Sequence, residues 1–138
     1  MLSPSRLRVV AHRWVSATLK RLYLKRFARA AIRAMGLELY SREEAHASNT
    51  LTAIANPEGI PSAAIIEMMR KDYGVVIAGA LEEVAGKVLR IAHMSSTSSQ
   101  MHILHTVRAL EYTLTRLGRR VPPGAGMQAA LGAFKGTE

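Results

Sequence analysis

The sequence predicts an α+β fold: a small, mainly antiparallel sheet with helices packed on one face, preceded by a long basic N-terminal helix. The assignable segments follow the order helix, strand, helix, strand, strand, helix, without an internal repeat. With 138 residues, 49% of them hydrophobic, the chain is long enough for one core and too short for two. We therefore expect a helix leading into the domain over residues 1–40, the domain itself over 41–118, and a Pro/Gly-rich tail over 119–138.

The N-terminal helix is predicted from Ser5 to Met35, because neither glycine nor proline occurs between Ser5 and Gly36. Residues 1–40 contain nine basic residues and one acidic residue, so most of the net charge of +9 lies there. In the second half of the helix the basic and the apolar residues fall on opposite sides, which predicts one solvated and one packed side. The basic side holds Arg21, Lys25, Arg26, Arg29 and Arg33, and the apolar side holds Tyr23, Leu24, Phe27, Ala28, Ala31 and Met35.

The next segments predict a strand, a turn and a helix. Leu51 to Ala55 is a run of small and branched residues typical of a strand. Asn56-Pro57-Glu58-Gly59 predicts a type I turn with proline second and glycine fourth. A helix then begins at Pro61, presents an apolar stripe up to Asp72 and ends at Gly74.

Two further strands are predicted over Val75–Ala78 and Lys87–Ala92. The polar cluster Ser95–Ser99 is suited to capping the last long helix, whose apolar residues recur from Met101 to Leu117 and which ends at Gly118. The run from Pro122 to Gly126 breaks regular structure. Met127 to Phe134 is compatible with one further short helix or with a disordered tail.

Arg90 is the residue in this pattern that calls for a chemical explanation. It interrupts an apolar strand, and its planar guanidinium can bind a carboxylate through two parallel hydrogen bonds. The structural alternative is an ion pair with Glu82, Glu83 or Glu111. Gly79 and Gly86 fit either a loop that lets backbone approach a ligand or neighbouring domain closely, or an ordinary hairpin.

Three segments in order resemble the C-terminal small domain of the class V, pyridoxal-phosphate-dependent aminotransferases of the alanine–glyoxylate/serine–pyruvate branch. They are Pro57-Glu58-Gly59-Ile60, Asp72-Tyr73-Gly74-Val75-Val76-Ile77 and Ala85-Gly86-Lys87-Val88-Leu89-Arg90-Ile91. The resemblance covers roughly Arg13 to Gly118 and implies that Arg90 grips the α-carboxylate of an amino acid or 2-oxo acid substrate. The chain departs from the family pattern at Ala80, Ala92 and Ser95, where glycine is usual.

The family's catalytic lysine, and the aspartate that binds the pyridine nitrogen, belong to its large domain. None of Lys20, Lys25, Lys71, Lys87 and Lys135 lies in that context, so no catalytic or cofactor-binding residue is assigned. The resemblance thus implies a domain that binds no pyridoxal phosphate and is inactive in isolation, and that contributes only the carboxylate arginine. Without the large domain, we expect an incompletely covered apolar side on the N-terminal helix, and hence a homo-oligomer or a partner chain.

Other kinds of site find less support in the sequence. His102 and His105 are three residues apart, with His93 nearby, but no carboxylate flanks them at ligand spacing, so no metal site is predicted. There is no apolar run near the ~20 residues that span a bilayer, so we expect a soluble protein. The absence of cysteine excludes disulfides but does not determine the compartment, which we expect to be the cytoplasm.

The alternative function is a non-catalytic binding or assembly module whose basic helix meets an acidic partner, a membrane surface or nucleic acid. An organellar transit peptide is a further possibility. Because the helix enters Gly36-Leu37-Glu38-Leu39-Tyr40 as it does in the family, we regard it as part of the fold. Among the partners of the basic helix, we do not expect nucleic acid.

Overall fold

A three-stranded antiparallel sheet forms one layer of the molecule. The computed structural model describes residues 22–41, 50–93 and 99–135. Within them, β1 (Leu51–Ala55), β2 (Ala78–Gly79) and β3 (Val88–Ala92) are arranged in the order β1-β3-β2, so β3 is central. An isolated bridge between Leu39 and Ile54 extends pairing along the free edge of β1. The predicted strand over 51–55 is confirmed residue for residue.

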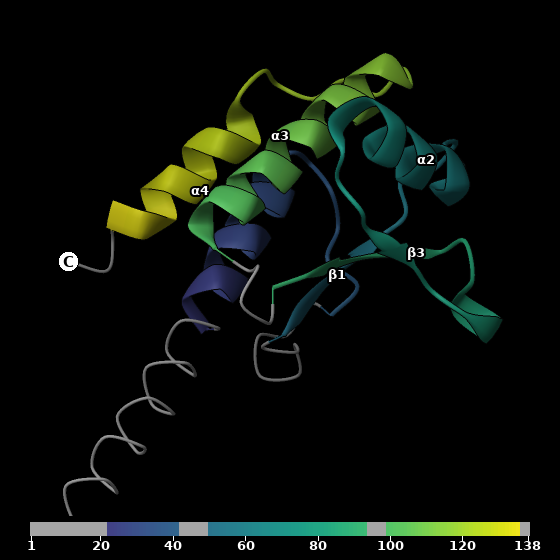
Figure 1. Cartoon of the computed structure of the whole chain (residues 1–138), viewed down its shortest axis with the longest axis horizontal. Helices are drawn as coiled ribbons and strands as arrows, with labels where there is room; N and C mark the ends of the chain where they lie inside the picture. Colours follow the sequence, from purple (N-terminus) through teal and green to yellow (C-terminus); the bar gives the residue numbers. More distant parts are fainter. Residues whose placement is uncertain (1–21, 42–49, 94–98, 136–138) are drawn as a thin grey trace, which may run out of the picture.

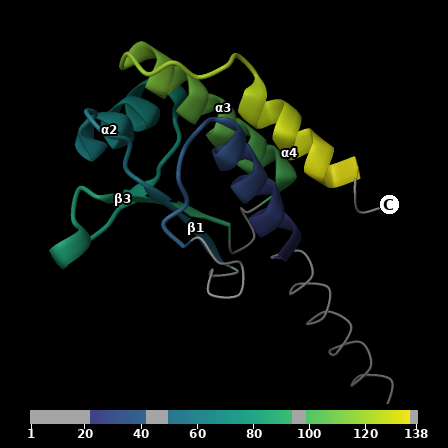
Figure 2. The ribbon, with the colours of Figure 1, turned by 180° about the vertical axis from the view of Figure 1, so that it is seen from behind.

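The helices form the second layer, on one side of the sheet (Figure 1). They comprise a helix over residues 22–34, which we call the N-terminal helix, together with α2 (Ser62–Tyr73), α3 (Gln100–Arg116) and α4 (Ala125–Lys135). A short 3-10 helix, η2 (Glu82–Val84), lies in the loop between β2 and β3. Seen from behind, the N-terminal helix lies beside α3 and α4 (Figure 2). The predicted α+β class with helices on one face is confirmed.

The core lies between the sheet and the helices. Residues that alternate along β1 and β3 are buried on the helical side, as expected for strands of period two: Thr52, Ile54, Leu89 and Ile91. The three apolar ones belong to one buried cluster with apolar residues of α2 and α3, namely Ile65, Met69, Ile103, Val107, Leu110 and Leu114. None of the helices in the described part of the chain is long and apolar enough to cross a membrane.

The predicted strand over 75–78 begins to pair later than expected, because the end of α2 holds the preceding residues. Gly74 adopts the left-handed conformation (φ 66°) that ends the helix, and the amide of Val75 donates to the carbonyl of Met69 at 3.1 Å. Val75 and Ile77 are buried, and only Ala78 and Gly79 pair with β3.

The turn after β1 is displaced by one residue from its predicted position. The amide of Asn56 still donates to the carbonyl of Lys87 at 2.8 Å, so this residue continues the pairing of β1 with β3. The carbonyl of Pro57 then accepts from the amide of Ile60, and Gly59 has φ +79°. The turn therefore runs over residues 57–60 with glycine third, the position that requires positive φ in a type II turn.

The N-terminal helix does not divide into an exposed basic side and a buried apolar side as expected. Arg26 and Arg33 are exposed as predicted, but Lys25 and Arg29 are only 4% and 3% exposed. Arg29 donates from Nη2 to the carbonyl of Ser41 at 3.0 Å. Burial of long basic side chains depends on which later segments cover the helix, and sequence periodicity does not contain that information.

The apolar side of this helix is covered in the described half, contrary to expectation. Leu24, Phe27, Ala28, Ala31, Ile32 and Met35 are each at most 1% exposed. The helix packs against α4, whose existence confirms the short-helix alternative for residues 127–134. The first part of the predicted helix, residues 5–21, lies outside the described residues.

Glu111 attaches α4 to α3. Its buried carboxylate accepts the amide of Gly126 at 2.7 Å through Oε1 and pairs with Arg108 at 2.8 Å through Oε2. The guanidinium of Arg108 lies 4.2 Å above the ring of Tyr112, and the bond to Glu111 is the main cause that raises the pKa of Arg108. The same Tyr112 stacks on Tyr73 of α2 with ring centroids 5.9 Å apart, so this group of side chains also joins α3 to α2.

Candidate carboxylate-binding site

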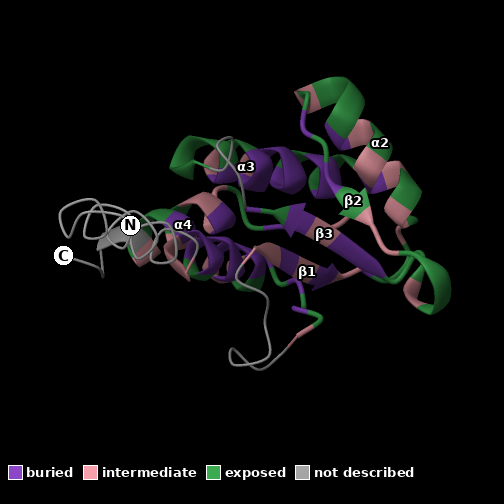
Figure 3. Cartoon of the chain, turned by 60° about the horizontal axis from the view of Figure 1, so that its bottom comes forward, coloured by how far each residue is buried: buried purple, intermediate pink, exposed green. Residues whose placement is uncertain are grey.

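The second face of the sheet is open. Its residues alternate with the buried ones and are mostly small: Leu51, Ala53, Ala55, Ala78, Val88, Arg90 and Ala92. All except Val88 are partly or fully exposed. Figure 3 brings this side of the molecule forward and shows no described helix across the strands. We call these seven residues the open sheet face.

Arg90 is at the centre of the open sheet face. It lies on the middle strand, and its register partners are Ala53 on β1 and Ala78 on β2. The side chain is half-buried, and its Nε–H donates to the carbonyl of Gly79 at 2.8 Å. Because the flanking side chains are methyl groups, only small groups stand beside the arginine on this face.

No carboxylate partners Arg90 within the described residues. None of the ion pairs found there includes it. Glu111, one of the expected partners, is on α3 and binds Arg108 and Gly126 instead. Glu82 and Glu83 are exposed in η2. The structural alternative of an ion pair is therefore not found in the described residues, and the guanidinium retains N–H donors that can bind an external carboxylate.

The small residues near Arg90 differ in what their backbone requires. Gly86 has φ +75°, which favours glycine, and it turns the chain into β3. Gly79 has no positive φ, and it pairs with Leu89 inside the sheet. Ala80 and Ala92, two of the departures from the family pattern, have ordinary backbone conformations, so their Cβ atoms add no strain. Ser95, the third departure, lies outside the described residues.

No lysine of the described side chains stands beside Arg90. Lys25 is buried in the N-terminal helix. Lys71 pairs with Glu67 one helical turn away at 2.9 Å, and this contact lowers the pKa of Glu67. Lys87 is exposed at the loop that precedes β3. The open sheet face therefore carries the guanidinium of Arg90 and no lysine amine.

The three histidines that are close together in the sequence lie in different surroundings. His93 is fully buried, and its Nε2 lies 3.0 Å from the hydroxyl of Thr52. His102 and His105 are exposed on α3, and Nε2 of His105 lies 3.0 Å from the carbonyl of Tyr73. Over the ranges that the structure describes, no group of three His, Cys, Asp or Glu residues could hold a metal ion.

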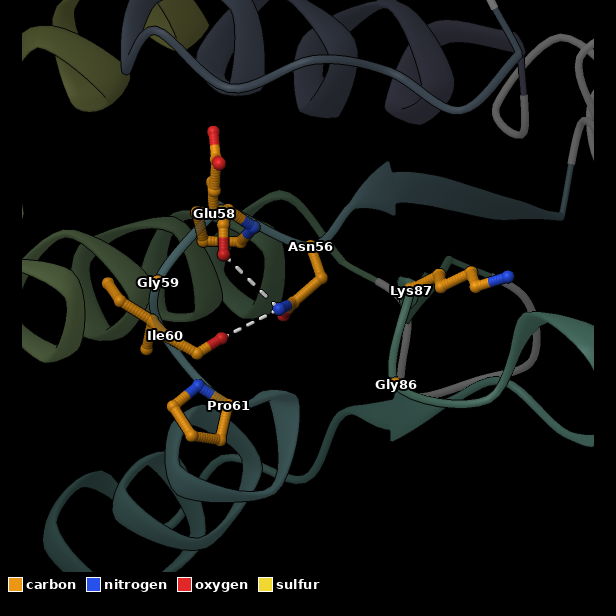
Figure 4. Close-up of a pocket in the computed structure, with 8 residues that line it drawn as sticks. Asn56, Glu58, Gly59, Ile60, Pro61, Gly86 and Lys87 are labelled. Carbon is orange, nitrogen blue, oxygen red and sulfur yellow. Dashed lines mark hydrogen bonds between the residues drawn. The ribbon is translucent and has the colours of Figure 1, made fainter.

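A hollow of about 440 Å³ lies between the turn after β1 and the loop before β3, and sequence reasoning did not find it (Figure 4). Its lining runs from Asn56 to Pro61 and includes Gly86 and Lys87. The side-chain amide of Asn56 donates through Nδ2 to the carbonyls of Pro57 at 3.3 Å and Ile60 at 2.7 Å, which shapes the wall. Arg90 does not line it, so the hollow is separate from the candidate site.

The curated proteins that the chain resembles include several aminotransferases. No protein-family model matches the chain. It is 35% identical over 103 residues to pyridoxamine–pyruvate transaminase from Mesorhizobium japonicum, which covers 75% of this chain and 26% of the relative. It is also 35% identical to serine–glyoxylate aminotransferase from Methylorubrum extorquens over 102 residues, 74% of this chain and 25% of the relative.

Solved structures agree with the sequence comparisons. Pyridoxamine–pyruvate aminotransferase from Mesorhizobium loti superposes with a TM-score of 0.83 at 30% identity, over 87% of this chain and 31% of that one. Ureidoglycine–glyoxylate aminotransferase from Bacillus subtilis superposes with a TM-score of 0.80 at 27% identity, over 84% of this chain and 30% of that one. The chain spans about a quarter of the length of the curated relatives it matches. The chain is therefore homologous to the C-terminal part of class V aminotransferases.

Proposed function

We propose that this chain supplies the substrate-carboxylate arginine of a pyridoxal-phosphate-dependent aminotransferase in the cytoplasm. Its substrates would be an alanine- or serine-type amino acid and a glyoxylate- or pyruvate-type 2-oxo acid. One observation carries the proposal: Arg90 is half-buried at the centre of a face of small side chains, with no carboxylate partner in the described structure.

The physical basis is the match between guanidinium and carboxylate. A guanidinium keeps its charge at every physiological pH and binds a carboxylate in a fixed plane, so it orients the substrate as well as holding it. Its place on the central strand favours rigid positioning. A polypeptide surface laid over the open sheet face would exclude water from this contact and thereby strengthen it.

The class V aminotransferases use pyridoxal phosphate, but the residues described here do not fit this cofactor on their own. The group needs an amine to hold its aldehyde, and no described lysine side chain stands on the open sheet face with Arg90. We therefore assign no cofactor-binding residue in this chain. The cofactor and its lysine would come from a partner chain that covers the open sheet face.

A chimera tests the proposal. The matched C-terminal region of the Methylorubrum extorquens serine–glyoxylate aminotransferase is replaced by this chain, and transamination is measured with alanine and glyoxylate as well as with the relative's own substrates. Arg90→Lys should lower kcat/KM by about 100-fold, mainly through KM, because the ammonium cannot form the two parallel bonds. Arg70→Leu is the control, since Arg70 is exposed on α2 and away from the open sheet face.

Two results would contradict the proposal. One is a chimera that binds pyridoxal phosphate and is active, yet is equally active with Arg90→Lys. The other is a chimera that folds by circular dichroism and binds the cofactor but transaminates none of these substrates.

The alternative of a basic module for acidic partners is not favoured. It needs the basic side of the N-terminal helix at the surface, whereas Lys25 and Arg29 are buried.

A further inference from the structure

The backbone carbonyl of Gly79 accepts a hydrogen bond from the side chain of Arg90, and this contact determines which edge of the guanidinium is available to a ligand. We propose that the carbonyl of Gly79 is the positioning group that aims Arg90, so that a carboxylate is received end-on by Nη1 and Nη2. The inference rests on the proposed role of Arg90. It adds the group that orients the side chain and the geometry of the bound ligand.

The first step is the inventory of donors. A guanidinium can meet a carboxylate with two parallel bonds either at its end, through Nη1 and Nη2, or at its side, through Nε and one Nη. In this protein the Nε–H already donates to the carbonyl of Gly79 at 2.8 Å. The side edge is therefore engaged, and the end edge remains for a ligand.

The second step is the rigidity of the acceptor. Gly79 pairs with Leu89, the residue that precedes Arg90 on β3, while Ala78 pairs with Arg90 itself. The carbonyl is thus placed by the same ladder that places the arginine. Upstream, Ile77 is 5% exposed and anchors β2 in the core. A short edge strand held in this way can act as a fixed support for a long side chain.

The third step concerns the glycine itself. Its backbone conformation does not require glycine, and a Cβ added there would meet only Cδ1 of Ile66, at 3.4 Å. Gly79→Ala therefore keeps the carbonyl in place with little disturbance. The positioning function belongs to the carbonyl and not to the absence of a side chain.

The test weakens this carbonyl without removing any side chain. The full chain is prepared by semisynthesis with Ala80 replaced by lactic acid, which turns the bond between residues 79 and 80 into an ester, a poorer acceptor. Leu81 replaced by its hydroxy-acid analogue places the ester one bond later and is the matched control, together with Gly79→Ala. Nitrogen-15 NMR then follows hydrogen exchange at Nε of Arg90.

The ester at position 80 should speed this exchange about tenfold, whereas both controls should leave it within about twofold of the unmodified chain. Equal exchange in the ester and unmodified chains would overturn the proposal, because Gly79 would then not hold the guanidinium.

A titration with pyruvate separates this proposal from the proposed function. The ester at position 80 should weaken pyruvate binding about fivefold. In a chain that already carries Arg90→Lys, the same ester should cause no further weakening. If Arg90→Lys weakens binding but the ester does not, the positioning role fails and the carboxylate role stands. If neither change alters binding, the carboxylate role of Arg90 itself fails.

Discussion

At the residue scale, Arg90 and Arg108 are two arginines with opposite relations to the fold. Arg108 compensates the buried carboxylate of Glu111. Arg90 has only a backbone carbonyl as its partner among the described residues. A charged group kept half-buried without a counter-charge contributes little to folding, so its presence calls for a functional explanation.

This contrast predicts the stability of two variants. Arg90→Leu should change the free energy of unfolding by no more than about 1 kcal/mol, since it removes one hydrogen bond and strands no charge. Arg108→Leu should cost clearly more, because it leaves Glu111 buried without its cation. Urea unfolding of both variants beside the parent chain measures the difference. A loss of about 3 kcal/mol or more for Arg90→Leu would show that Arg90 is structural.

The sequence was sufficient to single out Arg90 but not the group that holds it. A lone arginine in an apolar strand is visible in the alternation of residue types. Its bond to Gly79 depends on β2 lying next to β3 in a particular register, and only two residues of β2 pair. The strand expected from the sequence ends at Ala78 and leaves Gly79 in the following loop, where no register places its carbonyl beside Arg90.

At the element scale, packing decided what local patterns left open. The strand over residues 51–55 follows from its small and branched residues, which favour extended backbone locally. The ends of α2 follow from Pro61 and Gly74, because each acts on its immediate neighbours. The burial of Lys25 and Arg29 could not be predicted in the same way. It depends on segments far along the chain, and helical periodicity reports only which residues share a side.

The attachment of α4 gives a prediction at this scale. A Cβ on Gly126 would lie 2.8 Å from Cγ1 of Val107 and 2.9 Å from Oε1 of Glu111, so either α4 or these side chains must move if Gly126 becomes alanine. Gly126→Ala should therefore lower the free energy of unfolding by about 1–3 kcal/mol. The control is Gly132→Ala in the same helix, where nothing lies within 4 Å; this change should stabilise by up to about 1 kcal/mol.

Thermal unfolding followed by circular dichroism at 222 nm checks both glycine variants. If Gly126→Ala is as stable as Gly132→Ala, the close contact of α4 with α3 is not part of the fold in solution.

At the scale of the whole molecule, the uncovered surface is the open sheet face and not the described half of the N-terminal helix. Val76 and Leu81 lie two residues before and two residues after β2, and each is 77% exposed. Large exposed apolar side chains near an open sheet face are typical of an interface. We therefore expect the isolated chain to self-associate or to bind a hydrophobic dye.

Paired substitutions locate that surface. Val76→Lys with Leu81→Lys should lower both dye binding and the sedimentation coefficient at high concentration, because they place charge beside the open sheet face. Met101→Lys is the control, since Met101 is 72% exposed on α3. A parent chain that is monomeric and binds no dye, or one altered equally by the control, would contradict this expectation.

The last prediction concerns the cofactor at the same scale. Added to the isolated chain, pyridoxal phosphate should form no stoichiometric adduct at a single lysine, and the chain should show no transaminase activity. The reason is the environment of the amines: Lys71 is paired with Glu67 on the surface, Lys87 is exposed at a loop, and neither is placed to react selectively. Borohydride reduction followed by peptide mass spectrometry measures the adducts, with a complete class V aminotransferase as the positive control. Scattered, substoichiometric labelling is the expected result, because solvated amines react with aldehydes without selectivity. One lysine labelled to completion would contradict the prediction, and would mean that this chain holds the cofactor by itself.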